Sequence, residues 1–315
     1  MKKFILNIFL FACLSTVFTT LLILYYSRSH PLKEELPAPN LTHSISYNEK
    51  LEFIRRSKND TRVVAIGSSM CLNNLYSPSI LDKLHIRSYL NASSWGMSMK
   101  DTYILLQMLC EAHHPDTILL SSNTIDFQHK DKHANYFFIK HYLVSNDLLS
   151  YPYHLINFNL DYYKTNFEYL KEIRTIKTNY TYLKFDPYGA VNLEGKGFKI
   201  DPERWNLDFV IPAVPHQYAY FDSISTFCKD RNITLLFFQS PIRKNLFVKL
   251  SPQKVKMLAT HLNKIKTVLS RDQHTFVDAN RVLWQDSLFT DAIHFNTQGA
   301  KYYTEYCLDE VNRNH

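Results

Sequence analysis

The first feature of the hydrophobic pattern is an uncharged run of 23 residues, 4–26, that follows two lysines. At about 1.5 Å of rise per residue, such a run is long enough to cross a bilayer as a helix. It ends in Tyr25-Tyr26 rather than at small residues, which is typical of an interfacial anchor and is a poor cleavage site. We therefore predict a transmembrane signal anchor over 1–27. The lysines place the N-terminus in the cytoplasm and the rest of the chain in the periplasm or outside the cell.

A linker and one short helix are predicted over 28–60. Residues 28–45 contain three prolines and no apolar periodicity, which is typical of a linker. The next stretch, 46–57, has the spacing of an amphipathic helix. Ser46 is expected to cap it, and Glu49, three residues later, to complete a capping box.

From residue 62 onward, apolar runs with a strand pattern alternate with segments of helical periodicity. This alternation predicts an α/β fold in which helices cover both faces of a parallel five-stranded sheet. One helix has a clear start signal, since Ser251 stands before Pro252. The predicted strands are 62–67, 86–93, 116–122, 232–240 and 274–280. The predicted helices are 77–85, 100–113, 216–230, 251–270 and 297–311.

One long segment, 124–215, interrupts this rhythm within a domain that otherwise covers 61–315. It is rich in Tyr, Phe, Asn and His and has few apolar runs. We predict a helix over 161–178 and turns or a short hairpin over 186–198. The segment is interpreted as an insertion that caps the carboxyl edge of the sheet, and a surface excursion without function is the alternative.

Composition and charge narrow the function classes. The net charge is +7, but the Lys and Arg are scattered, and no nucleic-acid-binding motif is present, so we expect no nucleic-acid partner. The five cysteines form no Cys-x-x-Cys pair and predict no zinc site, and a disulfide pairing cannot be inferred from them. His129 and His133 have the spacing of metal ligands on a helix but lack a third ligand. The segment 189–197 lacks the ending of a phosphate-binding loop.

The candidate chemistry lies just after the predicted strands, where open parallel sheets bind their ligands. Each residue alone is a weak signal, because serines often cap helices, asparagines form turns, and most histidines have no catalytic role. What distinguishes this chain is that all of them follow strands of one sheet. They are Gly67-Ser68-Ser69 after the first strand, Gly96 after the second, Ser121-Ser122-Asn123 after the third, and Asp291 with His294 after the fifth.

This order resembles the SGNH/GDSL hydrolase superfamily over about 62–123 and 232–311. The family's Gly-Asp-Ser block corresponds to Gly67-Ser68-Ser69, so Ser69 takes the place of the nucleophile and Ser68 replaces the aspartate. The final Asp-x-x-His block is intact as Asp291 and His294.

The two middle blocks match in part. Gly96 matches the glycine of the second block. In the third block, Gly-x-Asn-Asp, only Asn123 matches, because Ser121 and Thr124 replace the glycine and the aspartate. A Gly-Ser-Ser block is similar to that of membrane-anchored relatives of the D-alanyl-transfer type and of proteins linked to polysaccharide acylation.

The resemblance implies a three-layer α/β/α, flavodoxin-like fold and a serine esterase site that needs no cofactor and no metal. His294 would be the base that activates Ser69, and Asp291 would orient its imidazole. The oxyanion donors would be the backbone N–H groups of Ser69 and Gly96 and the side-chain amide of Asn123.

The predicted function is that of a membrane-anchored, extracytoplasmic serine esterase or O-acyltransferase. Its substrates would be acyl esters of cell-surface or exported glycans, and a membrane-bound O-acyltransferase is a candidate partner. The sequence leaves hydrolysis and transfer open. The alternative is an inactive domain that binds acylated glycan or scaffolds a membrane complex, because the residues at 68, 121 and 124 depart from the family's pattern.

Overall fold

A five-stranded parallel sheet forms the centre of the protein. The computed structural model describes residues 2–28, 38, 40–42, 44–57, 61–129, 131, 134–144, 159–165, 184–193 and 214–313. The sheet order is β2-β1-β3-β4-β5, and every neighbouring pair is parallel. This is the flavodoxin-like order, so the predicted fold class is confirmed. The strands are β1 (Val63–Ala65), β2 (Leu90–Asn91), β3 (Thr117–Ser122), β4 (Thr234–Gln239) and β5 (Thr275–Asp278).

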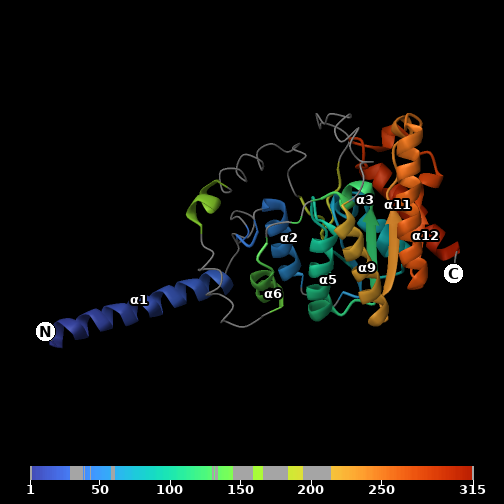
Figure 1. Cartoon of the computed structure of the whole chain (residues 1–315). Helices are drawn as coiled ribbons and strands as arrows, with labels where there is room; N and C mark the ends of the chain where they lie inside the picture. Colours follow the sequence, from blue (N-terminus) through green and yellow to red (C-terminus); the bar gives the residue numbers. More distant parts are fainter. Residues whose placement is uncertain are drawn as a thin grey trace.

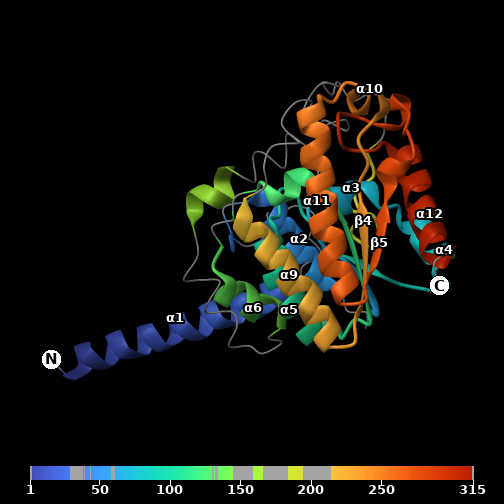
Figure 2. The ribbon, with the colours of Figure 1, turned by 45° about the vertical axis from the view of Figure 1, so that its right-hand side comes forward.

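Helices cover both faces of this sheet and complete three layers (Figures 1 and 2). One layer contains α5 (Met99–His113), α9 (Pro215–Asp230) and α11 (Pro252–Arg271), which pack against one another. The other contains α3 (Ser69–Asn74), α4 (Ser77–Lys83) and α12 (Thr297–Arg313). The layers enclose strands with nearly continuous apolar sequences, as a sheet buried on both faces requires.

The second predicted strand is shorter than expected. Residues 86–93 were expected to form a strand, but β2 consists only of Leu90 and Asn91. It lies at the edge of the sheet, where it pairs with two residues of β1. On its other side, the Asn91 backbone N–H donates to the Tyr188 carbonyl at 2.7 Å, so a loop from the insertion meets this edge.

Two helix starts were predicted from capping side chains, and one of them is confirmed. Ser251 caps α11 by accepting a hydrogen bond from the Lys254 backbone N–H at 3.3 Å, as predicted. The capping box predicted for 46–57 is wrong. Helix α2 (Ile45–Arg56) begins one residue earlier, so Ser46 lies in its first turn, and Glu49 accepts from the Ala38 backbone N–H instead.

The N-terminal segment forms one long apolar helix, α1 (Lys2–Arg28), which extends away from the sheet in Figure 1. The span Lys2–Leu22 has a mean hydropathy of 2.1 and is not buried against other parts of the protein. Large side chains such as Phe11 and Leu14 are exposed along it. The predicted apolar helix is therefore confirmed, and its length and composition suit a signal anchor or a signal peptide.

The insertion is described in part. It includes η2 (Thr124–Phe127), α6 (Tyr136–Val144), which packs on α5 and α2, and a helical stretch over 160–165. The predicted helix 161–178 lies outside the described residues beyond 165. A tight turn falls within 186–190, as expected, while 194–198 lies outside the described residues.

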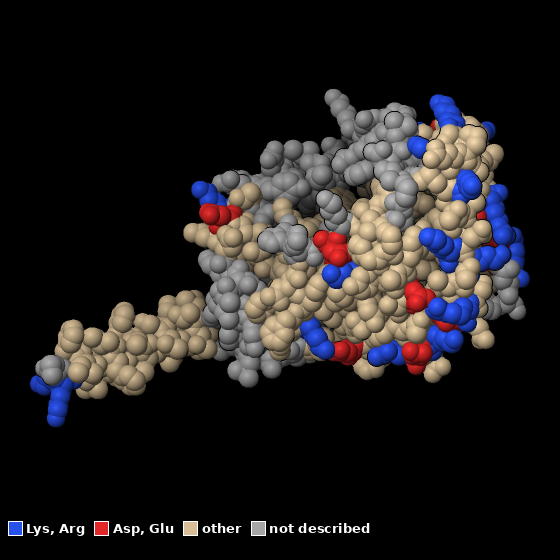
Figure 3. Space-filling model, in the orientation of Figure 1, with Lys and Arg blue, Asp and Glu red and all other residues tan. Residues whose placement is uncertain are grey.

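Basic side chains gather on the outer helix α11. Four lysines lie along it, and Lys244 and Lys249 precede it, whereas no Asp or Glu occurs from 244 to 271. In the view of Figure 3, Lys and Arg are concentrated at the end of the molecule formed by α11 and α12. Residues 244–271 therefore carry a net positive charge.

A buried histidine on α11 gives the fold a pH dependence. His261 is 3% exposed, and its ring nitrogens lie 2.9 Å from the Tyr218 hydroxyl and 3.3 Å from Gln239 Oε1. Burial lowers the pKa of this imidazole to about 4, although the nearby Asp126 carboxylate raises it.

We expect the protein to lose stability as the pH falls from about 6.5, the ordinary value for histidine in an unfolded chain, towards 4. In this window the unfolded chain binds the proton that buried His261 excludes, and the loss reaches about 3 kcal/mol. Denaturant unfolding in detergent at pH 7 and pH 4.5 measures it. His261→Gln should flatten the dependence, and an unchanged slope in this variant would contradict the assignment.

Candidate active site

Ser69 stands where the strand β1 is followed by the short helix α3. The turn needs a glycine, because Gly67 has a φ of +142° and a Cβ there would lie 2.9 Å from Leu120 Cδ1. Ser68 is the N-cap of α3, and its hydroxyl accepts from the Met70 backbone N–H at 3.1 Å. Ser69 is the first residue of the helix and is 9% exposed. The two neighbouring serines therefore differ, since one caps the helix and the other is presented at the sheet edge.

The structure brings Ser69, His294 and Asp291 into one hydrogen-bonded chain. His294 Nε2 lies 2.8 Å from Ser69 Oγ, and His294 Nδ1 lies 2.7 Å from Asp291 Oδ2. The serine follows β1 and the other two residues follow β5, at the same carboxyl edge of the sheet. The imidazole is 4% exposed and the aspartate 1%, so this contact is shielded from water.

Asp291 is held as a carboxylate by its surroundings. Burial raises the pKa of Asp291, but His294 and two backbone N–H groups lower it by more. The net pKa therefore lies below the usual range for an aspartate. The backbone N–H groups of Ile293 and His294 donate to Asp291 Oδ1 at 2.9 and 2.8 Å. One carboxylate oxygen therefore fixes the loop while the other faces the imidazole, and this arrangement holds the proton on His294 Nδ1.

Asn123 caps η2 and also contacts the residue that follows Ser69. Its Oδ1 accepts from the Ile125 backbone N–H at 2.9 Å. Its amide nitrogen donates to the sulfur of Met70, the residue after Ser69, at 3.2 Å. Within the described ranges, the Ser69 backbone N–H donates no hydrogen bond. Two of the three predicted donors, Ser69 and Asn123, are thus connected through Met70.

The loop that carries Gly96 is joined to the same region. Gly96 has a φ of +62°, which favours glycine. The Ser94 backbone N–H donates to the Gly67 carbonyl at 3.1 Å, and Trp95 Nε1 donates to Asn73 Oδ1 at 2.9 Å. The glycine loop is therefore tied to both ends of the segment that presents Ser69.

Two departures from the family's third block have roles in the buried core. The Ser121 hydroxyl is 2.9 Å from that of Ser240 and 2.8 Å from that of Tyr303, in a completely buried polar cluster. Thr124 begins η2, which Asn123 caps. Ser121 and Thr124 are therefore buried side chains. The contact between Ser69 and His294 is present although these two residues replace the family's glycine and aspartate.

Sequence patterns did not indicate the polar residues that hold these loops together. Asn73 and Asn74 end α3, and their side chains reach the Gly96 loop and the His294 loop. Thr290 donates from its backbone N–H and its hydroxyl to the His294 carbonyl, at 2.9 and 3.1 Å. The only local signal was a pair of asparagines soon after the serine.

The sequence predicts neither a metal site at His129 and His133 nor a phosphate-binding loop at 189–197. No group of three or more His, Cys, Asp or Glu among the described residues is placed to hold a metal ion. His129 lies 3.5 Å from Asp126, whereas His133 lies outside the described residues. The segment 189–197 is described only as far as 193 and begins in a turn.

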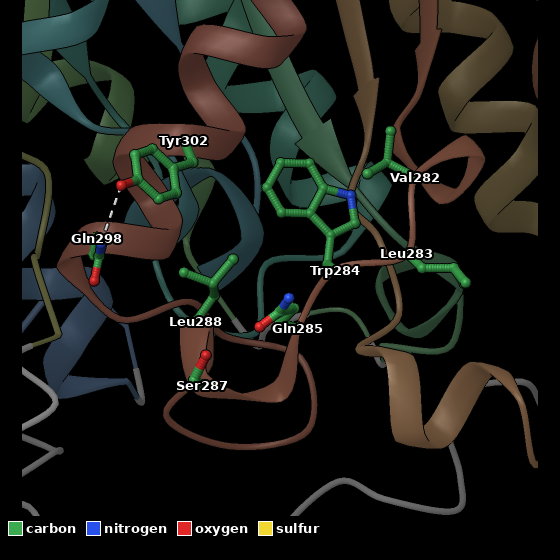
Figure 4. Close-up of a pocket in the computed structure, with 8 residues that line it drawn as sticks. All are labelled: Val282, Leu283, Trp284, Gln285, Ser287, Leu288, Gln298 and Tyr302. Carbon is green, nitrogen blue, oxygen red and sulfur yellow. Dashed lines mark hydrogen bonds between the residues drawn. The ribbon is translucent and has the colours of Figure 1, made fainter.

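A separate surface cavity of 460 Å³ lies beside the loop before Asp291 (Figure 4). Its lining is uncharged and includes Trp284, Leu288, Gln298 and Tyr302. Gln298 donates to the Tyr302 hydroxyl at 3.0 Å across one side of it. None of the residues predicted for the serine site lines this cavity.

Comparison with known proteins gives likeness in structure alone. No family model matches the sequence, and no curated protein matches it significantly. The chain is structurally similar to solved esterases at 11% identity, with TM-scores of 0.39 to 0.42. At these values the likeness assigns no activity. The three are the esterase EstA from Pseudoalteromonas sp. (80% of this chain, 97% of that chain), the acetyl xylan esterase AlAXEase (80% and 98%), and a GDSL-like lipase from Bacteroides thetaiotaomicron (84% and 94%).

Proposed function

We propose that the protein is a serine esterase or O-acyltransferase whose catalytic residues are Ser69, His294 and Asp291. The observation that carries the proposal is the contact of 2.8 Å between Ser69 Oγ and His294 Nε2, with Asp291 on the far side of the ring. A serine hydroxyl is a weak nucleophile until a base takes its proton, and an imidazole oriented by a buried carboxylate is suited to that task.

The reaction divides into two halves. In the first, Ser69 Oγ gives its proton to His294 Nε2 and attacks the carbonyl carbon of an ester. His294 then returns the proton to the leaving alcohol oxygen as the carbon–oxygen bond breaks, and an acyl group remains on Ser69. In the second, His294 takes a proton from water or from a sugar hydroxyl, whose oxygen attacks the acyl carbon. His294 then gives this proton to Ser69 Oγ as the bond between Oγ and the acyl carbon breaks.

Charge that develops on the carbonyl oxygen needs donors fixed in advance. The Ser69 backbone N–H suits this role because it donates no hydrogen bond within the described residues. The Asn123 amide nitrogen donates to the Met70 sulfur and has a second N–H for the same role. Gly96 would supply the third donor from the loop joined to Gly67. Loss of one such donor typically slows a reaction by about 10²- to 10³-fold.

The substrates we propose are acyl esters of exported or cell-surface glycans. The apolar helix α1 supports an anchored protein whose residues 61–315 lie in the periplasm or outside the cell. The lysine-rich surface of α11 suits an anionic glycan, because no acidic side chain from 244 to 271 offsets it.

The burial of the site favours transfer over hydrolysis. Ser69 and His294 are 9% and 4% exposed, and the segment 184–193 packs on the end of α3 through the Leu72 carbonyl, which accepts from the Val191 backbone N–H at 3.0 Å. An acyltransferase must keep water from its acyl-enzyme, and an insertion that caps the site would serve that purpose. A membrane-bound O-acyltransferase is then a candidate partner near the bilayer.

Incubating the full-length protein in detergent with an acetylated glycan and a second, unacetylated glycan separates the outcomes. We expect acetyl groups to appear on the second glycan faster than free acetate appears in solution. Free acetate alone would assign hydrolysis. Glycan binding without either product, unchanged in Ser69→Ala, would contradict an enzymatic role and favour a binding protein.

A further inference from the structure

We propose that the adjacent residues Asn73 and Asn74 are positioning residues that hold the two catalytic loops in register with Ser69. This inference rests on the proposed function of that site. Both side chains are completely buried at the C-terminal end of α3, and Ser69 is the first residue of the same helix. A helix of six residues thus carries the nucleophile at one end and both positioning residues at the other.

Asn74 brackets His294 from both sides. Its Oδ1 accepts from the Phe295 backbone N–H at 3.0 Å, and its Nδ2 donates to the Ile293 carbonyl at 3.3 Å. Ile293 and Phe295 are the immediate neighbours of His294 in the chain. The side chain therefore fixes the backbone on either side of the imidazole relative to α3, and so relative to Ser69.

The other hydrogen bonds of this loop do a different task. Asp291 binds backbone N–H groups of its own loop, and Thr290 binds the His294 carbonyl. These contacts set the internal shape of residues 290–294. Asn74 connects that shape to the helix that carries the nucleophile, so its loss would leave a formed loop whose distance to Ser69 is less well fixed.

Asn73 does the same for the loop of Gly96. Its Oδ1 accepts from Trp95 Nε1 at 2.9 Å, and its Nδ2 donates to the Val191 carbonyl at 3.0 Å. Trp95 directly precedes Gly96, and Val191 belongs to the described part of the insertion. Asn73 therefore joins the loop of Gly96 and the insertion to α3, whereas Asn74 joins the loop of His294 to the same helix.

The pairing makes each asparagine the control for the other. We expect Asn74→Ala to slow labelling of Ser69 by a fluorophosphonate by about 10²-fold, the scale of a misplacement of about 1 Å. It should also broaden or remove the downfield NMR signal of the His294 Nδ1 proton that lies against Asp291. Asn73→Ala should slow labelling less and leave that signal unchanged, because it acts on the other loop.

A double-mutant cycle distinguishes positioning from general destabilisation. If Asn74 acts through His294, Asn74→Ala should add nothing to the slow labelling of His294→Ala in the full-length protein. A further decrease of the same size in that background would overturn the inference. Thermal unfolding shows whether each variant is folded at the assay temperature. If Asn74→Ala is not, Asn74→Ser, which keeps a hydroxyl donor, replaces it in the cycle.

The failure of this inference differs from the failure of the proposed function. Wild-type protein that is folded but unlabelled would overturn the serine mechanism, while the NMR signal would still report whether Asn74 holds His294. Labelled wild type together with an unchanged rate and an unchanged Nδ1 signal in Asn74→Ala would overturn the role of Asn74 and leave the mechanism standing.

Discussion

Replacing Ser69 by alanine is expected to lower kcat for hydrolysis of a small acetyl ester by roughly 10⁴- to 10⁶-fold. The variant lacks the hydroxyl that lies 2.8 Å from His294 Nε2, so no acyl-enzyme can form. What remains is the effect of the oxyanion donors and of substrate binding. The effect falls on kcat, because the methyl group of alanine leaves the rest of the pocket in place. Steady-state kinetics with a chromogenic acetate in detergent measures it.

The neighbouring serine supplies the matched control. Ser68 caps α3 through the Met70 backbone N–H, and Ser68→Ala should cost about 1 kcal/mol of unfolding free energy. Its effect on kcat should be far smaller than that of Ser69→Ala. Equal losses of activity in both variants would indicate that the segment is sensitive to any change, and would count against Ser69 as the nucleophile.

The second large effect is expected at Asp291. Asp291→Asn should lower kcat by about 10⁴-fold with a smaller change in KM, because an amide no longer holds the proton on His294 Nδ1 or stabilises the imidazolium. The variant keeps the size of the side chain. It also keeps one oxygen that can accept from the backbone N–H groups of Ile293 and His294.

The pH dependence at Asp291 follows from its lowered pKa. His294 and the backbone N–H groups together outweigh burial, so the folded pKa of Asp291 lies below the usual range for an aspartate. The folded pKa lies below the unfolded one, so its contribution to stability is present above about pH 4 and is lost as the pH falls through the folded pKa. Asp291→Asn should remove this dependence in acid unfolding.

Asp278 is the control for Asp291. It lies at the end of β5, at the same sheet edge, and its carboxylate accepts from the Asn280 backbone N–H at 3.0 Å. Asp278→Asn should leave kcat within a few-fold of the wild-type value. A kcat of wild-type size in Asp291→Asn would contradict the proposed role of Asp291 in orienting the base.

The parts of the fold that could be predicted depend on local patterns. Apolar runs such as that of β3 indicate a strand buried on both faces, and Ser251-Pro252 indicates the start of α11. The site could be predicted from the sequence for a related reason. Residues that follow parallel strands meet at one edge, so Ser69 and His294 could be expected to lie near each other although 225 residues separate them.

The parts that could not be predicted depend on long-range partners. Asn74 binds Ile293, 219 residues later, and nothing in the sequence around it indicates that contact. The failed capping box has the same origin. Ser46 and Glu49 have the right spacing, but Asn48 binds the Thr42 backbone N–H at 2.8 Å and Glu49 binds Ala38, so tertiary contacts set where α2 begins.

The most direct test of Ser69 as the nucleophile is peptide mass spectrometry after reaction with a fluorophosphonate. We expect the adduct on Ser69 in the wild-type protein, no adduct in Ser69→Ala, and a much slower reaction in His294→Ala. An adduct on another residue, or none on folded wild-type protein, would contradict the account.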